Sequence, residues 1–331
     1  MNGRTPDQHT LLDAIALANR APSVHNTQPW RWRLDAGAIQ LRADPTRRLP
    51  ATDLDGRDLL LSCGAALHHL RVALGSLGWL AAVRYLPDPT DPALLATLTT
   101  TSQTPSEEDT TLAGAITRRR TDRRRFSSWP VPDQHLDVMV ERAANSGALL
   151  IPVTDPFTRS RLARAIDQAA CYQPDDLAYD MELTAWTGRG PAAVDGVLAA
   201  STPPVPQTHD DTTMRAFAPG TLAEAETGRD EPDGGRLLVL ATAADDRESV
   251  LRAGEAASAA LLTATEVGLA TCPLSQALEV PSTRALIRDQ VLDAAAYPHL
   301  VLRIGWAPTA APPPPWSPRR PATDTVDLPP G

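Results

Sequence analysis

Apolar residues recur at helical spacing over two long segments rich in alanine and leucine, residues 55–78 and 246–268. In the first segment Leu67, Leu70 and Leu74 lie three and four positions apart, which places them on one face of an α-helix. Each segment is therefore predicted to form a long helix with a buried apolar face. Small residues recur between the leucines, which favours close packing of one helix against the other.

The two helical segments match one another at a constant offset along the chain. Gly64 and Gly254 lie 190 positions apart, and so do the glycines that close the segments, Gly78 and Gly268. A repeat of this length is too long for a solenoid unit, so it predicts that a half-domain is duplicated within the chain. Chance similarity between alanine-rich helices is the alternative explanation.

Shorter elements are predicted around these two helices. The expected helices are 8–20, 107–119, 133–145, 156–171 and 176–186, and the expected strands are 30–34, 38–43, 80–86, 148–153, 237–241 and 299–306. Mixed helices and strands of this kind are typical of an α/β (α+β) fold. A Pro- and Thr-rich segment, 87–106, is predicted to be a linker, which divides the chain into halves 1–100 and 107–331.

Two segments lack a regular pattern of apolar residues. Residues 201–235 are rich in Pro, Gly, Asp and Thr, with one helical turn expected at 221–227. A loop of this length inside a compact domain is usually a lid or disordered, so we expect an inserted, lid-like segment. The tail from residue 308 on contains four consecutive prolines and is expected to be extended and to wrap the body rather than form regular structure.

Composition narrows the class of protein. With 331 residues, 42% hydrophobic and 21% charged, the chain resembles a folded, soluble globular protein. A formal net charge of -9 argues against a nucleic-acid partner, which would need a basic face. The polar N-terminus and the lack of a long uninterrupted apolar stretch indicate no membrane partner and favour the cytoplasm. The three widely separated cysteines are interpreted as buried thiols in a reducing compartment.

The chain contains no lysine, so all 31 basic residues counted as Lys or Arg are arginines. A Schiff base with pyridoxal phosphate and a Walker A phosphate loop both require a lysine, which excludes these two chemistries. Any phosphate must instead be bound by guanidinium groups or backbone amides. His68 and His69 are adjacent on a predicted helix and should point to different faces, so no metal site is expected.

Two polar segments are candidates for ligand binding. Residues 21–30 place hydroxyl, amide and imidazole side chains between two prolines, which stiffen the backbone and suit it to hold the edge of a planar heterocycle. A purely structural loop is the alternative. Residues 118–126 embed Asp122 among six arginines, so that one guanidinium could be oriented by the carboxylate while others bind an anion. A solvated charged face is the alternative there.

With these segments in view, the chain resembles the Acg-like branch of the FMN-dependent nitroreductase superfamily. The resemblance rests on APSVHNTQPW, WRL, RRTDRR, GLATCPLS, RIGW and a distal Pro-Arg-Arg-Pro, and it extends over about 9–321. Nitroreductases of this superfamily are homodimers in which an Arg-x-Ser/Thr element of one subunit and a Pro-Ser-x-x-Asn loop of the other share each FMN. Here each half of the chain retains one of the two elements. The resemblance therefore implies a pseudo-dimeric monomer with one FMN site per chain, leaving further oligomerisation open.

The resemblance also implies which residues contact the flavin. They are Arg119, Thr121 and Arg123 at the phosphate and pyrimidine edge, Ser23, Asn26 and Gln28 at the isoalloxazine, Ser275 and Gln276 near N5, and Arg319 and Arg320 closing on the phosphate from the tail. Among these, Arg123 is expected to stabilise the anionic reduced flavin. Many relatives carry a glutamate where this chain has Ser275, and this difference, with the inserted segment, sets the chain apart from ordinary nitroreductases.

The function implied is that of an FMN-binding oxidoreductase, in which NAD(P)H or a small organic molecule reduces the flavin and a second small molecule reoxidises it. Two alternatives remain open. One is a protein that sequesters FMN or senses redox state, with the flavin under a lid and little turnover. The other is a dedicated oxidase or dehydrogenase of a biosynthetic pathway.

Overall fold

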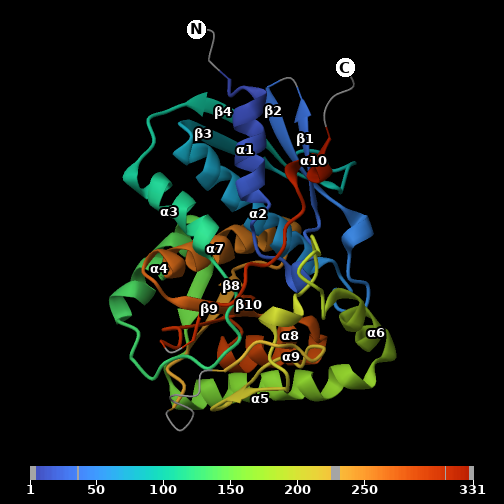
Figure 1. Ribbon diagram of the computed structural model, residues 1–331, viewed down its shortest axis with the longest axis vertical. Helices are drawn as coiled ribbons and strands as arrows, with labels where there is room; N and C mark the ends of the chain where they lie inside the picture. The colour runs from blue at the N-terminus through green and yellow to red at the C-terminus, as the bar shows by residue number, and fades with distance from the viewer. Residues whose placement is uncertain (1–4, 36, 225–231, 310, 328–331) are drawn as a thin grey trace.

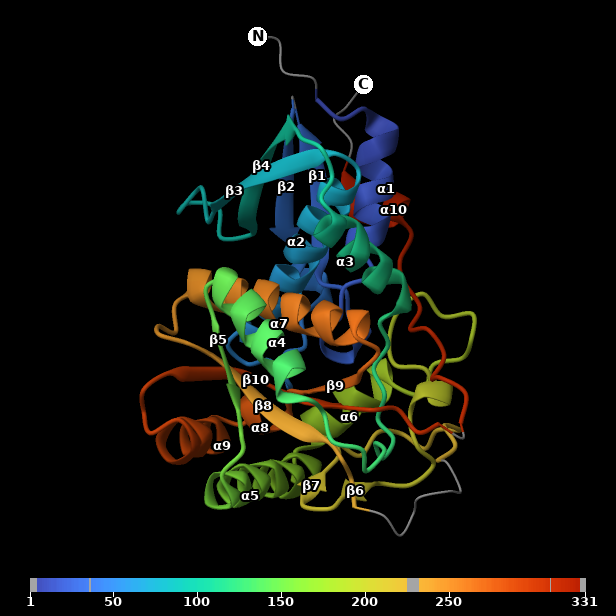
Figure 2. The same ribbon diagram turned by 90° about the vertical axis from the view of Figure 1, so that its left-hand side faces the viewer.

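Two long helices cross at the centre of the molecule, between two β-sheets (Figure 1). They are α2 (Arg57–Ser76) and α7 (Arg247–Glu266). The computed structural model describes residues 5–35, 37–224, 232–309 and 311–327. Figure 2 shows the order of the layers, with one sheet above α2 and the other sheet below α7. The expected mixed α+β architecture is confirmed.

The N-terminal half consists of one sheet with its helices. Its elements are α1 (Gln8–Ala18), β1 (Trp30–Asp35), β2 (Ala38–Ala43), α2, β3 (Trp79–Tyr85) and β4 (Leu94–Ser102), followed by α3 (Glu107–Arg118). The strand order is β11-β1-β2-β4-β3, with β11 (Val326–Asp327) contributed by the C-terminal tail.

The C-terminal half contains the second sheet, of strand order β5-β8-β10-β9. Its main elements are α4 (Asp133–Asn145), β5 (Leu149–Pro152), α5 (Pro156–Tyr172), α6 (Leu177–Trp186), β8 (Arg236–Thr242), α7, β9 (Ala270–Leu274), α8 (Gln276–Glu279), α9 (Pro281–Leu286) and β10 (Tyr297–Gly305). Two short strands, β6 (Thr208–His209) and β7 (Thr212–Thr213), pair as a separate hairpin.

The two halves repeat one topology. Each begins with a helix and two strands, continues with its long helix, and ends with two further strands. Within each sheet these strands are ordered first, second, fourth, third, and all of their pairings are antiparallel. The C-terminal half differs by the insertions between β5 and β8 and between β9 and β10. We propose that this shared topology reflects the duplication suggested by the sequence repeat.

Two glycines allow the central helices to touch backbone to backbone. A Cβ atom on Gly64 would lie 2.0 Å from the carbonyl oxygen of Leu251, and one on Gly254 would lie 2.1 Å from that of Leu61. Any side chain at either glycine would therefore separate the helices. The predicted close packing of α2 against α7 is confirmed, and the contact is reciprocal about the pair of glycines.

Helix α2 is long and apolar enough to cross a membrane by length and composition alone. Its apolar side chains are instead buried against α1, α7 and the first sheet, where Leu67, Leu70 and Leu74 are all 0% exposed. This burial is that of a core helix, which the leucine spacing predicts.

Several predicted elements differ from the structure. The predicted linker 87–106 is wrong, because residues 94–102 form β4, an inner strand paired with both β2 and β3. Alternating Leu and Thr residues supply one buried and one more exposed face to this strand, a pattern that the threonine-rich composition obscured. Strand β9 and the short helices α8 and α9 were not predicted. Of the expected turn at 221–227, residues 221–224 are not helical and the remainder lies outside the described residues.

The tail is extended only in part. Residues 311–321 contain neither helix nor strand, as expected, and they run back along the body to the N-terminal half. Beyond them the chain forms α10 (Ala322–Thr325) and β11, which pairs in parallel with β1. The expectation of no regular structure in the tail is therefore wrong at its end, where pairing satisfies backbone groups of an edge strand.

Candidate functional site

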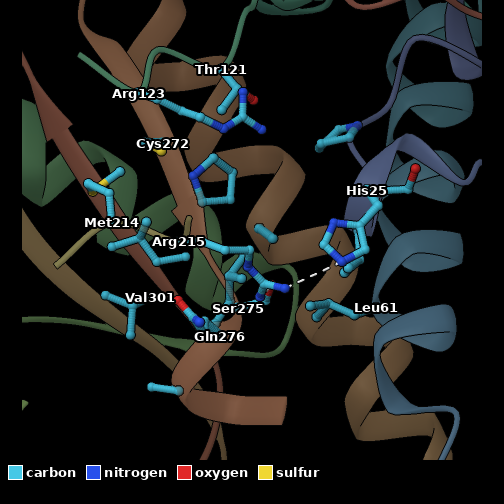
Figure 3. Close-up of a pocket in the computed structure, with 18 of the residues that line it drawn as sticks. His25, Leu61, Thr121, Arg123, Met214, Arg215, Cys272, Ser275, Gln276 and Val301 are labelled. Carbon is cyan, nitrogen blue, oxygen red and sulfur yellow. Dashed lines mark hydrogen bonds between the residues drawn. The ribbon is translucent and has the colours of Figure 1, made fainter. Parts of the chain in front are cut away.

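A cavity lies between the two halves, lined by side chains from both (Figure 3). We call it the central cavity. It encloses about 1130 Å³ of space, part of it open to solvent. Its walls are formed by both halves. They include Pro22 to His25, one face each of α2 and α7, Thr121 and Arg123, residues 272–277, and Pro203, Thr213, Met214, Arg215 and Phe217 of the inserted segment.

Five of the ten expected site residues line the central cavity. They are Ser23, Thr121, Arg123, Ser275 and Gln276. The loop that carries Thr121 is held beside β9, because Thr121 forms a parallel bridge with Thr271 and the amide of Asp122 donates to the carbonyl of Thr271 at 2.9 Å. Local backbone pairing thus places the Arg-rich loop and the Ser275 segment on one wall, opposite the proline-bounded loop.

Asp122 has the orienting role expected from its position among arginines. Its carboxylate accepts two hydrogen bonds from the guanidinium of Arg124, at 2.9 and 2.7 Å, and both side chains are buried. The partner is therefore Arg124, which leaves Arg119 and Arg123 unengaged by this carboxylate.

Asn26 and Gln28 do not line the central cavity. The Asn26 amide donates to the carbonyls of Gly196 and Pro318, both at 3.0 Å, and its oxygen accepts from Arg319 at 2.9 Å. The Gln28 amide donates to the carbonyl of Val194 at 3.0 Å, and its oxygen accepts from the backbone N–H of Arg320, in the tail, at 2.8 Å. These bonds occupy the side chains that the resemblance assigned to the isoalloxazine, so in the structure both amides brace the loop against the tail.

This loop has an uncommon backbone conformation. His25, Asn26 and Gln28 have φ angles of 49°, 56° and 51°. Left-handed backbone is unfavourable for residues with a Cβ, and it is often retained where a functional site constrains the chain. The surrounding hydrogen bonds maintain this conformation, which sequence patterns do not reveal.

Three arginines converge beside the loop, and we call them the arginine cluster. They are Arg20 after α1, Arg119 after α3, and Arg319 in the tail. Arg319 donates to the carbonyls of Arg20 and Ala21 at 2.9 and 3.2 Å. Nε of all three and Nη1 of Arg119 are shielded from solvent and have no hydrogen-bond partner. Among the described residues, none of the three has a carboxylate within 4.0 Å.

The arginine cluster carries repelling positive charges in a poorly solvated place. Arg119 is only 5% exposed. Burial, reinforced by the charge of Arg20, lowers the pKa of Arg119 to about 10. Burial also lowers the pKa of Arg319 well below its usual value, with Arg119 and Arg20 adding to the effect. Buried guanidinium groups with unused N–H donors form a site suited to an anion such as phosphate.

Arg320 does not join the arginine cluster. Its guanidinium donates to the carbonyls of Gln28 and Asp324, at 3.3 and 2.8 Å, and lies 3.9 Å from Asp44. The side chain therefore fastens the tail to the first sheet. Of the two tail arginines expected at the phosphate, the structure places only Arg319 beside Arg119.

Arg215, which the sequence reasoning missed, enters the central cavity from the inserted segment (Figure 3). Its guanidinium forms an ion pair with Glu279 and donates to the Tyr179 hydroxyl at 2.9 Å and to Ser275 Oγ at 3.2 Å. It also lies 3.3 Å from His25 Nε2. We call Arg215 and Glu279 the latch pair. Pro203, Met214 and Phe217 of the same segment also line the cavity, and we call the described part of residues 201–235 the cover segment; its role as a lid stays a prediction.

Electrostatics strengthen the latch pair. Burial disfavours both charges, but Glu279, with Tyr179 and Asp58, outweighs that effect on Arg215, so the pKa of Arg215 is raised. Arg215 likewise outweighs burial of the carboxylate, so the pKa of Glu279 is lowered. Glu279 also accepts from Ser275 Oγ at 2.7 Å, which connects the latch pair to an expected site residue.

The histidines of α2 do not diverge as expected. The Nδ1 atoms of His68 and His69 both lie 2.8 Å from Ser258 Oγ on α7. The close approach of the two helices brings one hydroxyl within reach of both rings, so the prediction that they point apart is wrong. Across the residues that the structure describes, no group of three or more His, Cys, Asp or Glu side chains is arranged to hold a metal ion.

The chain was compared with protein families, with curated proteins and with solved structures. No protein-family profile matches it. A Mycobacterium tuberculosis H37Rv protein named "Putative NAD(P)H nitroreductase Rv3131" is 45% identical over 329 residues, which is 99% of this chain and 94% of that protein. The protein of the same strain named "Putative NAD(P)H nitroreductase acg" is 37% identical over 321 residues, which is 96% of this chain and 95% of that protein.

Solved structures match only distantly. A Desulfitobacterium hafniense nitroreductase with bound FMN aligns with a TM-score of 0.40 and 13% identity, covering 66% of this chain and 97% of that one. The FMN- and NADPH-dependent nitroreductase NfnB from a Sphingopyxis strain gives a TM-score of 0.40 and 17% identity, covering 65% of this chain and 97% of that one. The identity and coverage of the two mycobacterial relatives decide the assignment: the chain belongs to the nitroreductase family that includes acg, a family of oxidoreductases.

Proposed function

We propose that the chain binds one FMN between its two halves and catalyses two-electron transfer from NAD(P)H to a small-molecule acceptor. The names of the relatives support the reductant, and the architecture supports the single site, because each half contributes a different wall of the central cavity. The arrangement needs no second subunit to complete it. A cytoplasmic location and a pseudo-dimeric monomer remain part of this proposal.

The arginine cluster is the observation that carries the proposal. Arg119 is buried, and two of its nitrogen atoms have no hydrogen-bond partner. Arg20 and Arg319 each have one further nitrogen, Nε, that is shielded from solvent and has no hydrogen-bond partner. Leaving such charges unpaired costs free energy, which a phosphate would recover through charge-assisted hydrogen bonds. The donor set therefore fits the phosphate of FMN.

The central cavity fits the ring system in the same way. Leu61, Ala65, Ala257 and Leu261 of α2 and α7 supply an apolar floor. Gln276 presents an Oε1 atom without a hydrogen-bond partner, which is available to an N–H group of a ligand. When bound, FMN would supply two-electron redox chemistry through its isoalloxazine.

Arg123 supplies positive charge to the central cavity. Its guanidinium donates to the carbonyl of Ser201 at 3.0 Å and lies 4.7 Å from the Phe217 ring centroid, so the cover segment fixes its direction. Burial lowers its pKa, yet a guanidinium remains protonated at neutral pH. We assign it to the pyrimidine edge, where a cation stabilises the negative charge of a reduced flavin.

Flavin binding provides the direct test. The purified protein, or protein reconstituted with FMN, should show flavin absorbance at one FMN per chain. Arg119→Met should weaken FMN binding by roughly 10- to 100-fold, because it removes one charge-assisted contact. Arg164→Met, at an exposed position on α5, is the matched control and should leave binding unchanged. Protein that binds no FMN under any of these conditions contradicts the proposal.

A second candidate function is FMN sequestration with little turnover. The latch pair favours it, because Arg215 is 8% exposed and Glu279 0% exposed by side chain, so the cover segment is fastened inside the cavity by a buried ion pair. Steady-state oxidation of NADH and NADPH with quinone and nitroaromatic acceptors separates the two functions. Rapid turnover would contradict sequestration, whereas bound FMN that neither nicotinamide reduces would support it.

A further inference from the structure

Two further cavities adjoin the central cavity and form a series with it. A small one, the linking cavity, lies beneath the proline-bounded loop and offers about 10 Å³ to the centre of a water molecule, which is room for about one water. Ser62 and Val24 line both the central and the linking cavity. Asp53 lines both the linking cavity and a larger outer cavity, whose other walls include the exposed residues Leu54 and Asp55. Shared wall residues therefore place the three cavities next to one another, between the protein surface and the wall of the central cavity.

Asp58 lies in the middle of this series, in the first turn of α2. It is 1% exposed, lines the linking cavity, and neither of its carboxylate oxygens accepts a hydrogen bond. Arg57 approaches Oδ1 to 3.1 Å, but its hydrogen bonds go to the carbonyls of His299 and Leu278, at 3.1 and 2.8 Å. A buried carboxyl group that accepts no hydrogen bond is costly when ionised, which favours its protonated form.

Several charged or titratable groups surround this carboxyl. They are Arg57 on the same helix, Asp53 before it, Arg47 and Arg48 across the linking cavity, Glu279 of α8, and Arg215 of the cover segment. Burial is the largest influence, opposed by Arg57 and reinforced by Asp53, and together they raise the pKa of Asp58 to about 7.

The other titratable groups at this end of the central cavity are poor proton donors at neutral pH. Burial, with Arg215, lowers the pKa of His25 to about 3, so its imidazole is neutral. Burial raises the pKa of Tyr179 to about 12. The pKa of Glu279 is lowered by Arg215 against the effect of burial, so that carboxylate stays ionised. Of these described groups and Asp58, only the Asp58 carboxyl has a pKa near neutral pH, which suits it to donate a proton there.

We propose that Asp58 is the proton carrier of the central cavity, passing protons that enter through the outer cavity and Asp53 to the reacting molecules past Ser62. This inference rests on the proposed function. Reduction of a quinone-type acceptor by NAD(P)H moves a hydride equivalent from the nicotinamide to the acceptor and needs one proton, giving NAD(P)⁺ and the hydroquinone. Asp58 would release that proton, through water in the linking cavity, and regain one from solvent. Asp58 does not touch the reacting molecules itself, because the proton passes through water, so it is a relay group and not a catalytic residue.

The two half-reactions test the proposal in the flavin-loaded protein. Reduction by NAD(P)H takes up only a hydride equivalent, whereas reduction of the acceptor requires the proton. Asp58→Asn should slow acceptor reduction about 100-fold or more in stopped-flow measurements, with a changed pH profile, and leave reduction by NAD(P)H within about threefold. Asp58→Glu should restore much of the rate. Asp137→Asn, at an exposed position on α4, is the control and should change neither half-reaction.

A readout without flavin separates this proposal from the proposed function. Infrared difference spectra of flavin-free wild-type protein and Asp58→Asn should show a protonated carboxylic acid at about pH 5 that is lost by about pH 9. An Asp58 that is ionised at about pH 5, or equal slowing of both half-reactions, overturns the proposal even if the protein is an active flavoenzyme. Protein with the infrared signature that binds no FMN overturns the proposed function, and the relay with it.

Discussion

At the scale of single residues, the site is defined by charges that lack ordinary partners. Arg119 and Arg319 have unused donors and repel one another, while Asp58 is buried and has unused acceptors. Such groups destabilise a fold unless a ligand or proton compensates them. They are therefore sensitive points at which ligand binding and pH should change stability.

The arginine cluster should bind inorganic phosphate in the flavin-free protein. Millimolar phosphate is expected to raise the melting temperature of the wild type relative to chloride at equal ionic strength, since only the folded state presents the site. Arg119→Met should melt higher than the wild type without phosphate, because a repelling charge is gone, and should respond less to phosphate. Equal stabilisation of both proteins by phosphate would show that the anion binds elsewhere. Differential scanning calorimetry gives both values.

Asp58 should make stability fall as pH rises. Burial raises its pKa to about 7 in the folded protein from an ordinary value of 3.8, so the folded state binds more protons between these values. Its stabilising contribution is complete below about pH 4 and is lost as pH rises through about 7. Asp58→Asn should thus be more stable than the wild type at about pH 8, by roughly 1–3 kcal/mol, with the difference shrinking toward about pH 4. Urea denaturation from about pH 4 to about pH 8 measures this difference in the free energy of unfolding. A difference that stays constant over this range would contradict the raised pKa of Asp58.

At the scale of elements, the crossing of α2 and α7 depends on two glycines. Gly64→Ala should destabilise the protein by roughly 3 kcal/mol or more, because the new methyl group would lie 2.0 Å from the carbonyl oxygen of Leu251 and force the helices apart. Gly114→Ala in α3 is the matched control. A Cβ there meets nothing within 4 Å, so the substitution should stabilise by about 0.5–1 kcal/mol through helix propensity. Chemical denaturation that ranked the two substitutions equally would refute the close contact.

At the scale of the whole molecule, the cover segment joins the two halves through the latch pair. Arg215→Met should leave Glu279 buried and unpaired, costing roughly 3–5 kcal/mol, whereas the double variant Arg215→Met with Glu279→Gln should recover most of that loss. In flavin-loaded protein the double variant should also be reoxidised faster by bulky quinones, because the cover is no longer fastened. If reoxidation is unchanged, the cover segment does not limit access to the cavity.

Much of the molecule was predictable from local patterns. The spacing of Leu67, Leu70 and Leu74 determined a helix with one buried face, and the small residues recurring in α2 and α7 indicated that the helices pack together. The Arg-rich loop and the proline-bounded loop were recognisable because their residue types suit anion and heterocycle binding. Ser23, Thr121, Arg123, Ser275 and Gln276 accordingly line one cavity.

Only the tertiary structure decided how these polar groups are used. The amides of Asn26 and Gln28 turn to the tail because backbone groups lie within hydrogen-bond distance there, and Arg320 faces the first sheet for the same reason. Arg215 meets Glu279 across 64 positions of the chain, within a segment without periodicity. Sequence determines local propensity and residue chemistry, whereas pairing between distant polar groups depends on which ones folding removes from water together.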